Sequence, residues 1–110
     1  MTQEQAIPEI TRRLVDYCHP ERIYLFGSAA RGDGGPDSDL DFCVVLPDDA
    51  PPGLYRPGVH RALWDVGTAA GVVRWSASDF DVRAAHVKAS LPATILREGK
   101  VLYGARRVAA

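Results

Sequence analysis

The side chains of this sequence that could do chemistry, judged by their types and spacing, lie in two short motifs. Asp39 and Asp41 are two positions apart, and Gly27-Ser28 precedes them along the chain. Residues two apart on a strand project from the same face, so the two carboxylates would lie side by side. Adjacent carboxylates repel each other unless a cation lies between them. A hard divalent ion such as Mg²⁺ suits carboxylate oxygens and shares its coordination shell with substrate phosphates. The pair therefore predicts a magnesium site.

The Gly27-Ser28 pair is suited to holding a phosphate. Gly27 follows an apolar run and lets the backbone turn where a side chain would obstruct a ligand. Ser28 would begin a helical turn, whose free N–H groups and partial positive charge favour a phosphate, and its hydroxyl can donate to a phosphate oxygen. Arg31, one turn further on, could point to the same anion or hold the loop in place. The two motifs together predict a site for a metal-bound nucleoside triphosphate, because in-line phosphoryl transfer needs mainly positioning and charge neutralisation.

Each motif alone is a weak signal, since Asp79 and Asp81 form a second Asp-x-Asp pair. The combination is stronger: a strand, Gly-Ser, an intervening loop, and then Asp-x-Asp at the start of an apolar strand. The alternative is a loop exit with solvated carboxylates. It is disfavoured because Asp41 falls inside the predicted strand, where an unpaired carboxylate is costly.

The elements that must position these motifs alternate along the chain. Apolar spacing and turn residues predict helices over 3–18, 28–31 and 59–70, and a final helix that begins at residue 90. A capping box is predicted at 76–79. Strands are predicted over 22–26, 39–46, 72–75 and 100–103. Prolines and glycines over 47–58 predict a surface loop. We expect one α/β (α+β) domain over residues 1–110, with a small mixed sheet and helices packed mainly on one face.

Composition narrows the classes of function. The 110 residues carry a net charge of −1, which argues against direct nucleic-acid binding through a basic face. We find no apolar run that could span a membrane and no secretory leader, so we expect a soluble cytoplasmic protein. Cys18 and Cys43 are predicted to be buried free thiols. The core is small enough that a partner or a second copy could cover part of the surface.

The run LFGSAARG followed by SDLDF resembles the signature of the minimal nucleotidyltransferases, within the DNA polymerase beta superfamily. The resemblance extends over most of the chain, through VVRW to ILREGKVLYG. Many members of this family pair with a HEPN-domain protein, a ribonuclease-type toxin, and act as its antitoxin. Some transfer AMP from ATP to a tyrosine of the toxin. The resemblance therefore implies a nucleotidyltransferase fold. It also implies a Mg²⁺-dependent transferase that uses ATP to modify a hydroxyl group, that of a tyrosine, on a partner toxin.

The resemblance also implies roles for individual residues. Gly27 and Ser28 match the motif that holds the phosphates, and Arg31 matches the basic residue that follows it. Asp39 and Asp41 match the two catalytic, metal-binding carboxylates. Ser38, at the start of SDLDF, is grouped with the nucleotide-binding residues.

One departure from the family pattern concerns a third carboxylate. Family enzymes usually carry it on the strand after the second helix, where it helps to bind a metal and deprotonates the attacking hydroxyl. Gly71 occupies that position here, and Asp65 and Asp79 could replace it only with a shifted geometry. This predicts as an alternative a catalytically impaired antitoxin that acts by protein–protein binding. A nucleotide sensor is a third possibility, whereas the chain is short for an aminoglycoside-modifying enzyme.

Three further residues have two readings each. Trp75 and Phe80 could stack on an adenine ring, although such side chains more often pack in the core. Arg74 is either a charge at a sheet edge or a phosphate contact.

Overall fold

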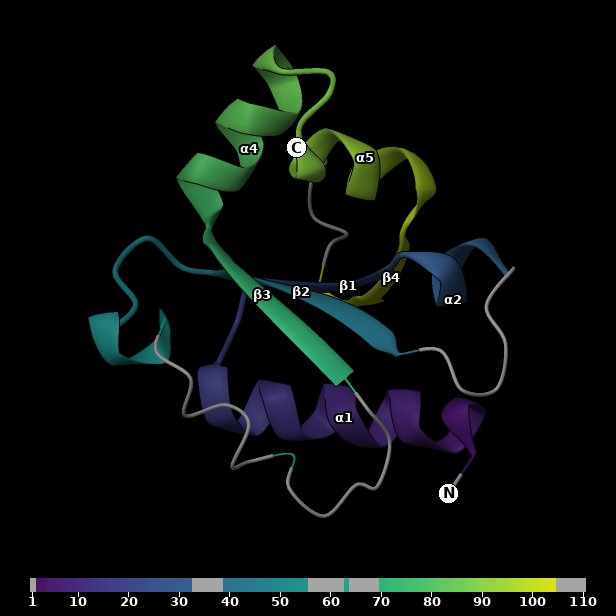
Figure 1. The fold of residues 1–110 in the computed structure, drawn as a ribbon. Coiled ribbons are helices and arrows are strands. Elements are labelled where there is room, and N and C mark those ends of the chain that lie inside the picture. The colour runs from purple at the N-terminus through teal and green to yellow at the C-terminus, as the bar shows by residue number, and fades with distance from the viewer. Residues whose placement is uncertain (1, 33–38, 56–62, 64–69, 105–110) are drawn as a thin grey trace.

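The computed structural model describes residues 2–32, 39–55, 63 and 70–104 of the chain. Its helices lie on both sides of one sheet, with α1 on one side and α4 and α5 on the other (Figure 1). The described elements are α1 (Gln3–Cys18), β1 (Arg22–Phe26), α2 (Ser28–Arg31), β2 (Leu40–Leu46), the 3-10 helix η1 (Pro52–Tyr55), β3 (Ala70–Ser76), α4 (Ala77–His86), α5 (Leu91–Glu98) and β4 (Lys100–Tyr103). None of these helices combines the length and apolar character needed to cross a membrane.

The sheet is mixed, as the sequence predicted. Its strand order is β3-β2-β1-β4. β1 pairs with β2 and with β4 in antiparallel fashion, whereas β2 and β3 are parallel. The register aligns Phe26 of β1, Asp41 of β2 and Gly71 of β3 across the sheet. The predicted site is therefore at the start of a central strand, with a neighbour on each side.

Helices cover both faces of the sheet, because β2 carries apolar side chains on both of its faces. Alternate residues from Leu40 to Leu46 pack against the buried stripe of α1. Cys43 and Val45 point the other way and pack with Phe80 of α4 and Ile95 of α5. A strand that is buried on both faces needs a layer on each. The fold class is thus confirmed, but the described helices are divided between the two faces, where the sequence analysis had placed them mainly on one.

Most predicted elements are present with small changes at their ends. The capping box of α1 is formed, since Thr2 Oγ1 accepts from the Gln5 N–H at 3.1 Å and Gln5 Oε1 accepts from the Thr2 N–H at 3.0 Å. β2 begins one residue later than predicted, and β3 is longer, running from Ala70 to Ser76. The helix predicted over 59–70 lies outside the described residues except at Leu63 and Ala70, and Ala70 belongs to β3. The two cysteines are buried and free, as predicted.

Phe80 is a core residue and not a platform for adenine. It has no exposed surface, and its ring stacks on Tyr24 with centroids 5.5 Å apart. Trp75 meets the Phe80 ring edge-on at 6.5 Å and remains half-buried. Arg74 lies on the edge strand β3 and donates through Nη2 to the Tyr55 carbonyl at 3.4 Å. The structure confirms the interpretation of Phe80 as a core residue, and Arg74 fits the interpretation as a charge at the sheet edge.

Asp48 connects the loop after β2 to the first turn of α4. Its carboxylate accepts from both the hydroxyl and the backbone N–H of Ser78, the latter at 2.9 Å. These two hydrogen bonds hold the pKa of Asp48 below its ordinary value of 3.8, with the hydroxyl making the larger contribution. A lowered pKa means that the stabilisation is present above the pKa of the unfolded chain and is lost as the pH falls through the folded value.

We therefore expect Asp48→Ala to lower the melting temperature at neutral pH and to have less effect below pH 3.8. Thermal unfolding followed by circular dichroism across this range is the measurement. The matched control is Asp49→Ala, one residue further along the same exposed loop. An equal loss in both variants would show that the Ser78 contact has no special role.

Candidate functional site

Asp41 is the centre of the candidate site. It is the second residue of β2 and is half-buried, whereas Asp39 lies just before the strand and is exposed. Strand alternation puts Asp41 on the same face as Cys43 and Val45, which is the face that α4 and α5 cover. The negative charge of Asp39 acts on Asp41 across the short distance between them. The structure therefore brings the two predicted carboxylates together.

A glycine flanks the Asp41 carboxylate on each side. A β-carbon added at Gly27 would lie 2.5 Å from Asp41 Oδ2, and one added at Gly71 would lie 3.4 Å from Asp41 Oδ1. The first distance is a clash and the second is ordinary contact. Gly27 also has a φ of +78°, a conformation that L side chains rarely adopt. Bare backbone at both positions keeps the carboxylate accessible from β1 and from β3.

The Gly27-Ser28 turn lies directly beside Asp41 because β1 ends opposite it. The Gly27 carbonyl accepts from the N–H groups of Ala30 and Arg31, at 3.1 and 3.2 Å, and this closes α2 into a compact turn. Ser28 is the first residue of that turn and is half-buried. The structure thus brings the predicted phosphate-holding pair and the carboxylates into one place.

Arg31 makes a contact that the sequence did not indicate. Its Nη1 lies 3.9 Å from Oε1 of Glu98 at the end of α5, and both side chains are about half exposed. This contact joins α2 to α5, so holding the loop in place is the better supported of the two predicted roles. Glu98 lies 67 residues further along the chain (98 − 31), and no sequence signal linked it to the motif. Ser38 lies outside the described residues.

The electrostatics of the pair favour a cation. Burial raises the pKa of Asp41, and the neighbouring charge of Asp39 raises it further. Two carboxylates are a suitable donor set for Mg²⁺, which typically takes one or two from the protein and the rest of its shell from water and substrate phosphates. Within the described residues no group of three or more Asp, Glu, His or Cys side chains gathers that could hold a metal by itself. The donor set therefore fits an ion that arrives with a substrate.

The place opposite Asp41 on β3 belongs to Gly71, in agreement with the register expected from the sequence. Of the two possible substitutes, Asp79 is exposed in the first turn of α4, and Asp65 lies outside the described residues. Two half-buried apolar side chains, Val73 and Trp75, follow Gly71 on the same face. Val73 was not singled out from the sequence, although strand alternation starting from Gly71 would have found it.

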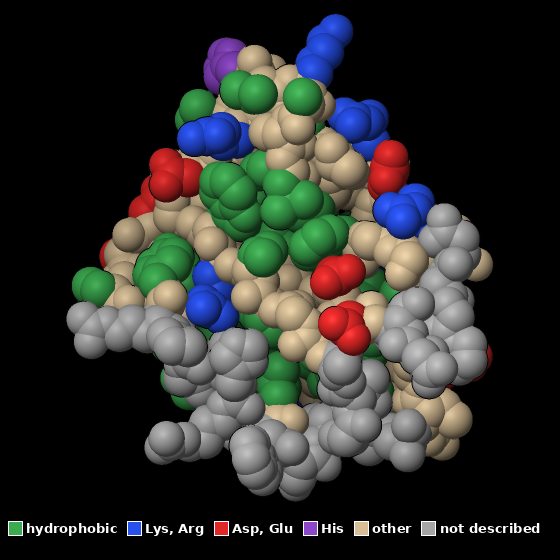
Figure 2. Space-filling model, viewed as in Figure 1, with side chains coloured by type: hydrophobic (Ala, Val, Ile, Leu, Met, Phe, Trp, Pro, Cys, Tyr) green, Lys and Arg blue, Asp and Glu red, His purple; other side chains and the backbone are tan. Residues whose placement is uncertain are grey.

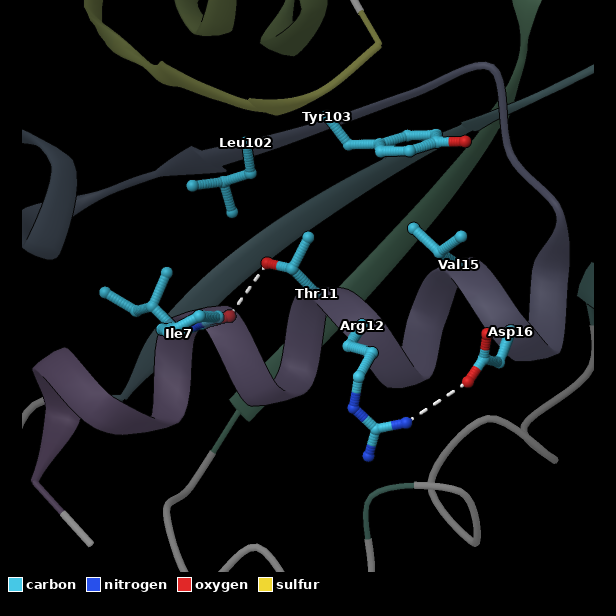
Figure 3. A pocket seen from close by; sticks show the side chains of 8 residues that line it. Ile7, Thr11, Arg12, Val15, Asp16, Leu102 and Tyr103 are labelled. Atoms are coloured by element: carbon cyan, nitrogen blue, oxygen red, sulfur yellow. Dashed lines mark hydrogen bonds and ion pairs between the residues drawn. The ribbon is translucent and has the colours of Figure 1, made fainter.

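A hollow lies between α1 and the edge strand β4, on the side of the sheet opposite to α4 and α5 (Figure 3). The polar side chains of α1 that line it are paired within the helix: Thr11 donates to the Ile7 carbonyl at 2.7 Å, and Arg12 contacts Asp16 at 3.2 Å. Tyr103 and Leu102 form the opposite wall. This hollow has no connection to Asp41, and it is not part of the site.

Neutralising Asp41 is expected to stabilise the metal-free protein. Because its pKa is raised, the charged form is disfavoured by folding above the folded pKa, and this cost disappears as the pH falls below it. We expect Asp41→Asn to have a higher melting temperature than the unmodified chain at neutral pH, and no advantage at pH values well below 3.8. Asp39→Asn, which removes the repulsion but not the burial, should give a smaller rise. A lower melting temperature for metal-free Asp41→Asn would contradict this account.

The sequence matches the family model described as a nucleotidyltransferase domain over residues 5–67 of the chain. That segment is more than half of the 110 residues and contains both motifs. No functionally curated protein matches the sequence.

Two solved structures resemble the fold. One is a toxin–antitoxin crystal structure with AMP-PNP: it is 20% identical, the match covers 90% of this chain and 74% of the other, and the TM-score is 0.61. The second is a protein from Sulfolobus solfataricus described as a candidate nucleotidyltransferase: it is 17% identical, the match covers 94% of this chain and 81% of the other, and the TM-score is 0.56. At these identities the likeness concerns the fold.

Proposed function

The chain belongs to the family of nucleotidyltransferase domains, and from that premise we propose that it transfers AMP from ATP to a tyrosine hydroxyl of a partner toxin as the antitoxin of the pair. One observation carries the proposal. Asp41 is held beside Gly27-Ser28 on one side and remains open on the other, with Asp39 next to it. This arrangement keeps β-carbons away from the Asp41 carboxylate on the Gly27 side and on the Gly71 side.

The nucleotide and the partner are supported by the structural neighbour. That protein is a toxin–antitoxin assembly, and it was crystallised with AMP-PNP, an ATP analogue. A HEPN-domain toxin is the partner that the sequence motifs favour. A small domain with a site open toward one edge strand is suited to a protein acceptor.

Each residue has a definite task in this proposal. Asp39 and Asp41 would hold Mg²⁺, which when bound supplies positive charge to the substrate phosphates. Ser28 would donate its hydroxyl to a phosphate oxygen, and Gly27 keeps a β-carbon away from the Asp41 carboxylate. The acceptor oxygen forms a bond to the α-phosphorus, while the bond from that phosphorus to the oxygen bridging to the β-phosphorus breaks. Pyrophosphate leaves, and the hydroxyl proton passes to solvent.

The test is the intact mass of the protein encoded next to this chain, measured after incubation with this chain, ATP and Mg²⁺. We expect a gain of one or more adenylyl groups, and peptide mapping should place them on tyrosine. The matched control omits Mg²⁺. No gain in mass, with the complex intact and the nucleotide bound, would refute transfer to this partner.

Gly71 supports a second candidate, an antitoxin that neutralises by binding alone. The position opposite Asp41 carries no carboxylate, so a family residue that deprotonates the acceptor is missing there. In this case Asp39→Asn combined with Asp41→Asn would still neutralise the toxin in a growth assay. Loss of neutralisation while the variant still forms the complex would refute binding alone and favour transfer.

A further inference from the structure

The two oxygens of the Asp41 carboxylate face different neighbours, and this defines two sides of the site. Oδ2 faces Gly27 on β1 and Oδ1 faces Gly71 on β3, and these strands flank β2. Under the proposed function, the leaving pyrophosphate belongs to the Gly27-Ser28 side. Attacking and leaving oxygens are roughly in line in phosphoryl transfer, so the acceptor must approach from the side of β3.

The β3 side is apolar beyond Gly71. Val73 and Trp75 lie on the same face as Asp41 and pack against the buried cluster that contains Cys43, and they remain half-buried because β3 is an edge strand. Figure 2 shows a hydrophobic patch on this side of the molecule, with two acidic side chains beside it. A flat aromatic ring could lie on such a surface with its polar end toward the carboxylates.

Gly71 itself offers no group that could accept a proton from the acceptor. An aliphatic hydroxyl has a pKa close to that of water, far above that of a phenol, and needs a base to become a nucleophile. The phenol of tyrosine has a pKa of about 10, so at neutral pH it forms its anion far more often. An acceptor that ionises by itself is one that a site without a base at position 71 can still use.

We propose that Gly71 is a specificity-determining residue: it restricts transfer to phenolic hydroxyls, whose aromatic ring lies on Val73 and Trp75. The inference rests on the proposed function and adds a selection rule to it. The phenol loses its proton to solvent before reaction. Its oxygen then bonds to the α-phosphorus as pyrophosphate leaves, so the step needs no base at position 71.

The first test uses small acceptors and the unmodified chain with ATP and Mg²⁺. N-acetyl-tyrosine amide should be adenylylated at least ~100-fold faster than N-acetyl-serine amide, a factor typical of a missing acid–base group. Ring-fluorinated tyrosine amides, which are more acidic, should change the rate systematically with acidity. Equal rates for serine and tyrosine, or rates that ignore fluorination, would overturn the proposal without touching the proposed function. Absence of transfer to every acceptor and to the partner would instead refute the proposed function.

The second test restores a carboxylate. A β-carbon at position 71 makes only ordinary contact with Asp41 Oδ1, so the backbone there leaves room for the β-carbon of Gly71→Asp. We expect it to raise transfer to serine amide by ~100-fold and to weaken the dependence on fluorination. Gly71→Asn, which matches it in shape but not in charge, should do neither. The same gain in both variants, or a loss of tyrosine transfer in Asp65→Asn to the level of serine, would overturn the proposal.

A readout without turnover tests the ring surface. The methyl resonances of Val73 should shift when N-acetyl-tyrosine amide is added together with AMP-PNP and Mg²⁺, and should not shift with the serine amide. Val73→Thr keeps the shape of the side chain and should raise the KM for the tyrosine amide several-fold while leaving kcat and the KM for ATP unchanged. An unchanged KM, or no methyl shift, would remove Val73 from the acceptor surface.

Discussion

Replacing Asp39 and Asp41 together by asparagine should reduce nucleotide transfer by on the order of 1,000-fold or more, because electrostatic stabilisation of the transferred group is the largest single contribution in such sites. Asp41 lies beside Gly27, and the charge of Asp39 acts on it. An asparagine amide keeps the shape of each side chain but cannot neutralise a cation. The measurement is the initial rate of AMP transfer, by mass spectrometry, at saturating ATP and Mg²⁺.

The control for this pair is the second Asp-x-Asp motif. Asp79→Asn with Asp81→Asn makes the same chemical change in α4, and both of these side chains are exposed. This control should keep its transfer rate within a few-fold of the unmodified chain. Loss of the 3.0 Å contact between Asp81 and Arg22 should lower its melting temperature only slightly. Unchanged transfer in the Asp39/Asp41 double variant would refute the proposed site.

Gly27→Ala should reduce both stability and transfer, for two separable reasons. With ψ at −157°, the φ of +78° lies in a region that is essentially restricted to glycine, and it costs an L residue on the order of 1–3 kcal/mol. In addition, the new β-carbon would approach Asp41 Oδ2 to 2.5 Å, so the carboxylate must move. Displacing a reacting group by about 1 Å can cost on the order of 100-fold in rate. Denaturant unfolding and the initial transfer rate measure the two effects.

Gly32→Ala is the control, because Gly32 also has a positive φ, +81° with ψ at 9° in the left-handed helical region, but no atom lies within 4 Å of an added β-carbon. It should lose a smaller amount of unfolding free energy, about 1–2 kcal/mol, and keep the transfer rate. If both variants lose activity to the same extent, the effect comes from the backbone of the α2 turn and not from the contact with Asp41. If neither loses stability, the positive φ is not strained in the way we infer.

The expected stabilisation by Asp41→Asn and the expected loss of transfer in the double variant have the same origin. A half-buried carboxylate beside a second charge is unfavourable for folding and favourable for a cation. The charge that lowers the stability of the folded protein would thus be the charge that binds its ligand. Melting temperatures measured with and without Mg²⁺ and AMP-PNP should show a larger ligand-induced rise for the unmodified chain than for Asp41→Asn.

Local sequence rules determined the elements and the motifs. The helix at Gln3–Cys18 follows from its apolar spacing and the Thr2 cap, and the strand at Arg22–Phe26 ends at Gly27, as predicted. The Asp-x-Asp spacing placed the two carboxylates together, because side-chain direction along a strand depends only on alternation. These features involve interactions within a few residues, so a linear reading reaches them.

Only the tertiary structure decided what meets these motifs from elsewhere in the chain. The pairing of β2 with β3 put Gly71 beside Asp41, where the sequence could only suggest a register. The contact between Arg31 and Glu98, and the division of the helices between the two faces, were not predicted. Ser38 and the helix expected over 59–70 lie outside the described residues and stay predictions. Contacts between distant segments depend on how the whole sheet and its two helical layers pack, and no local pattern encodes that choice.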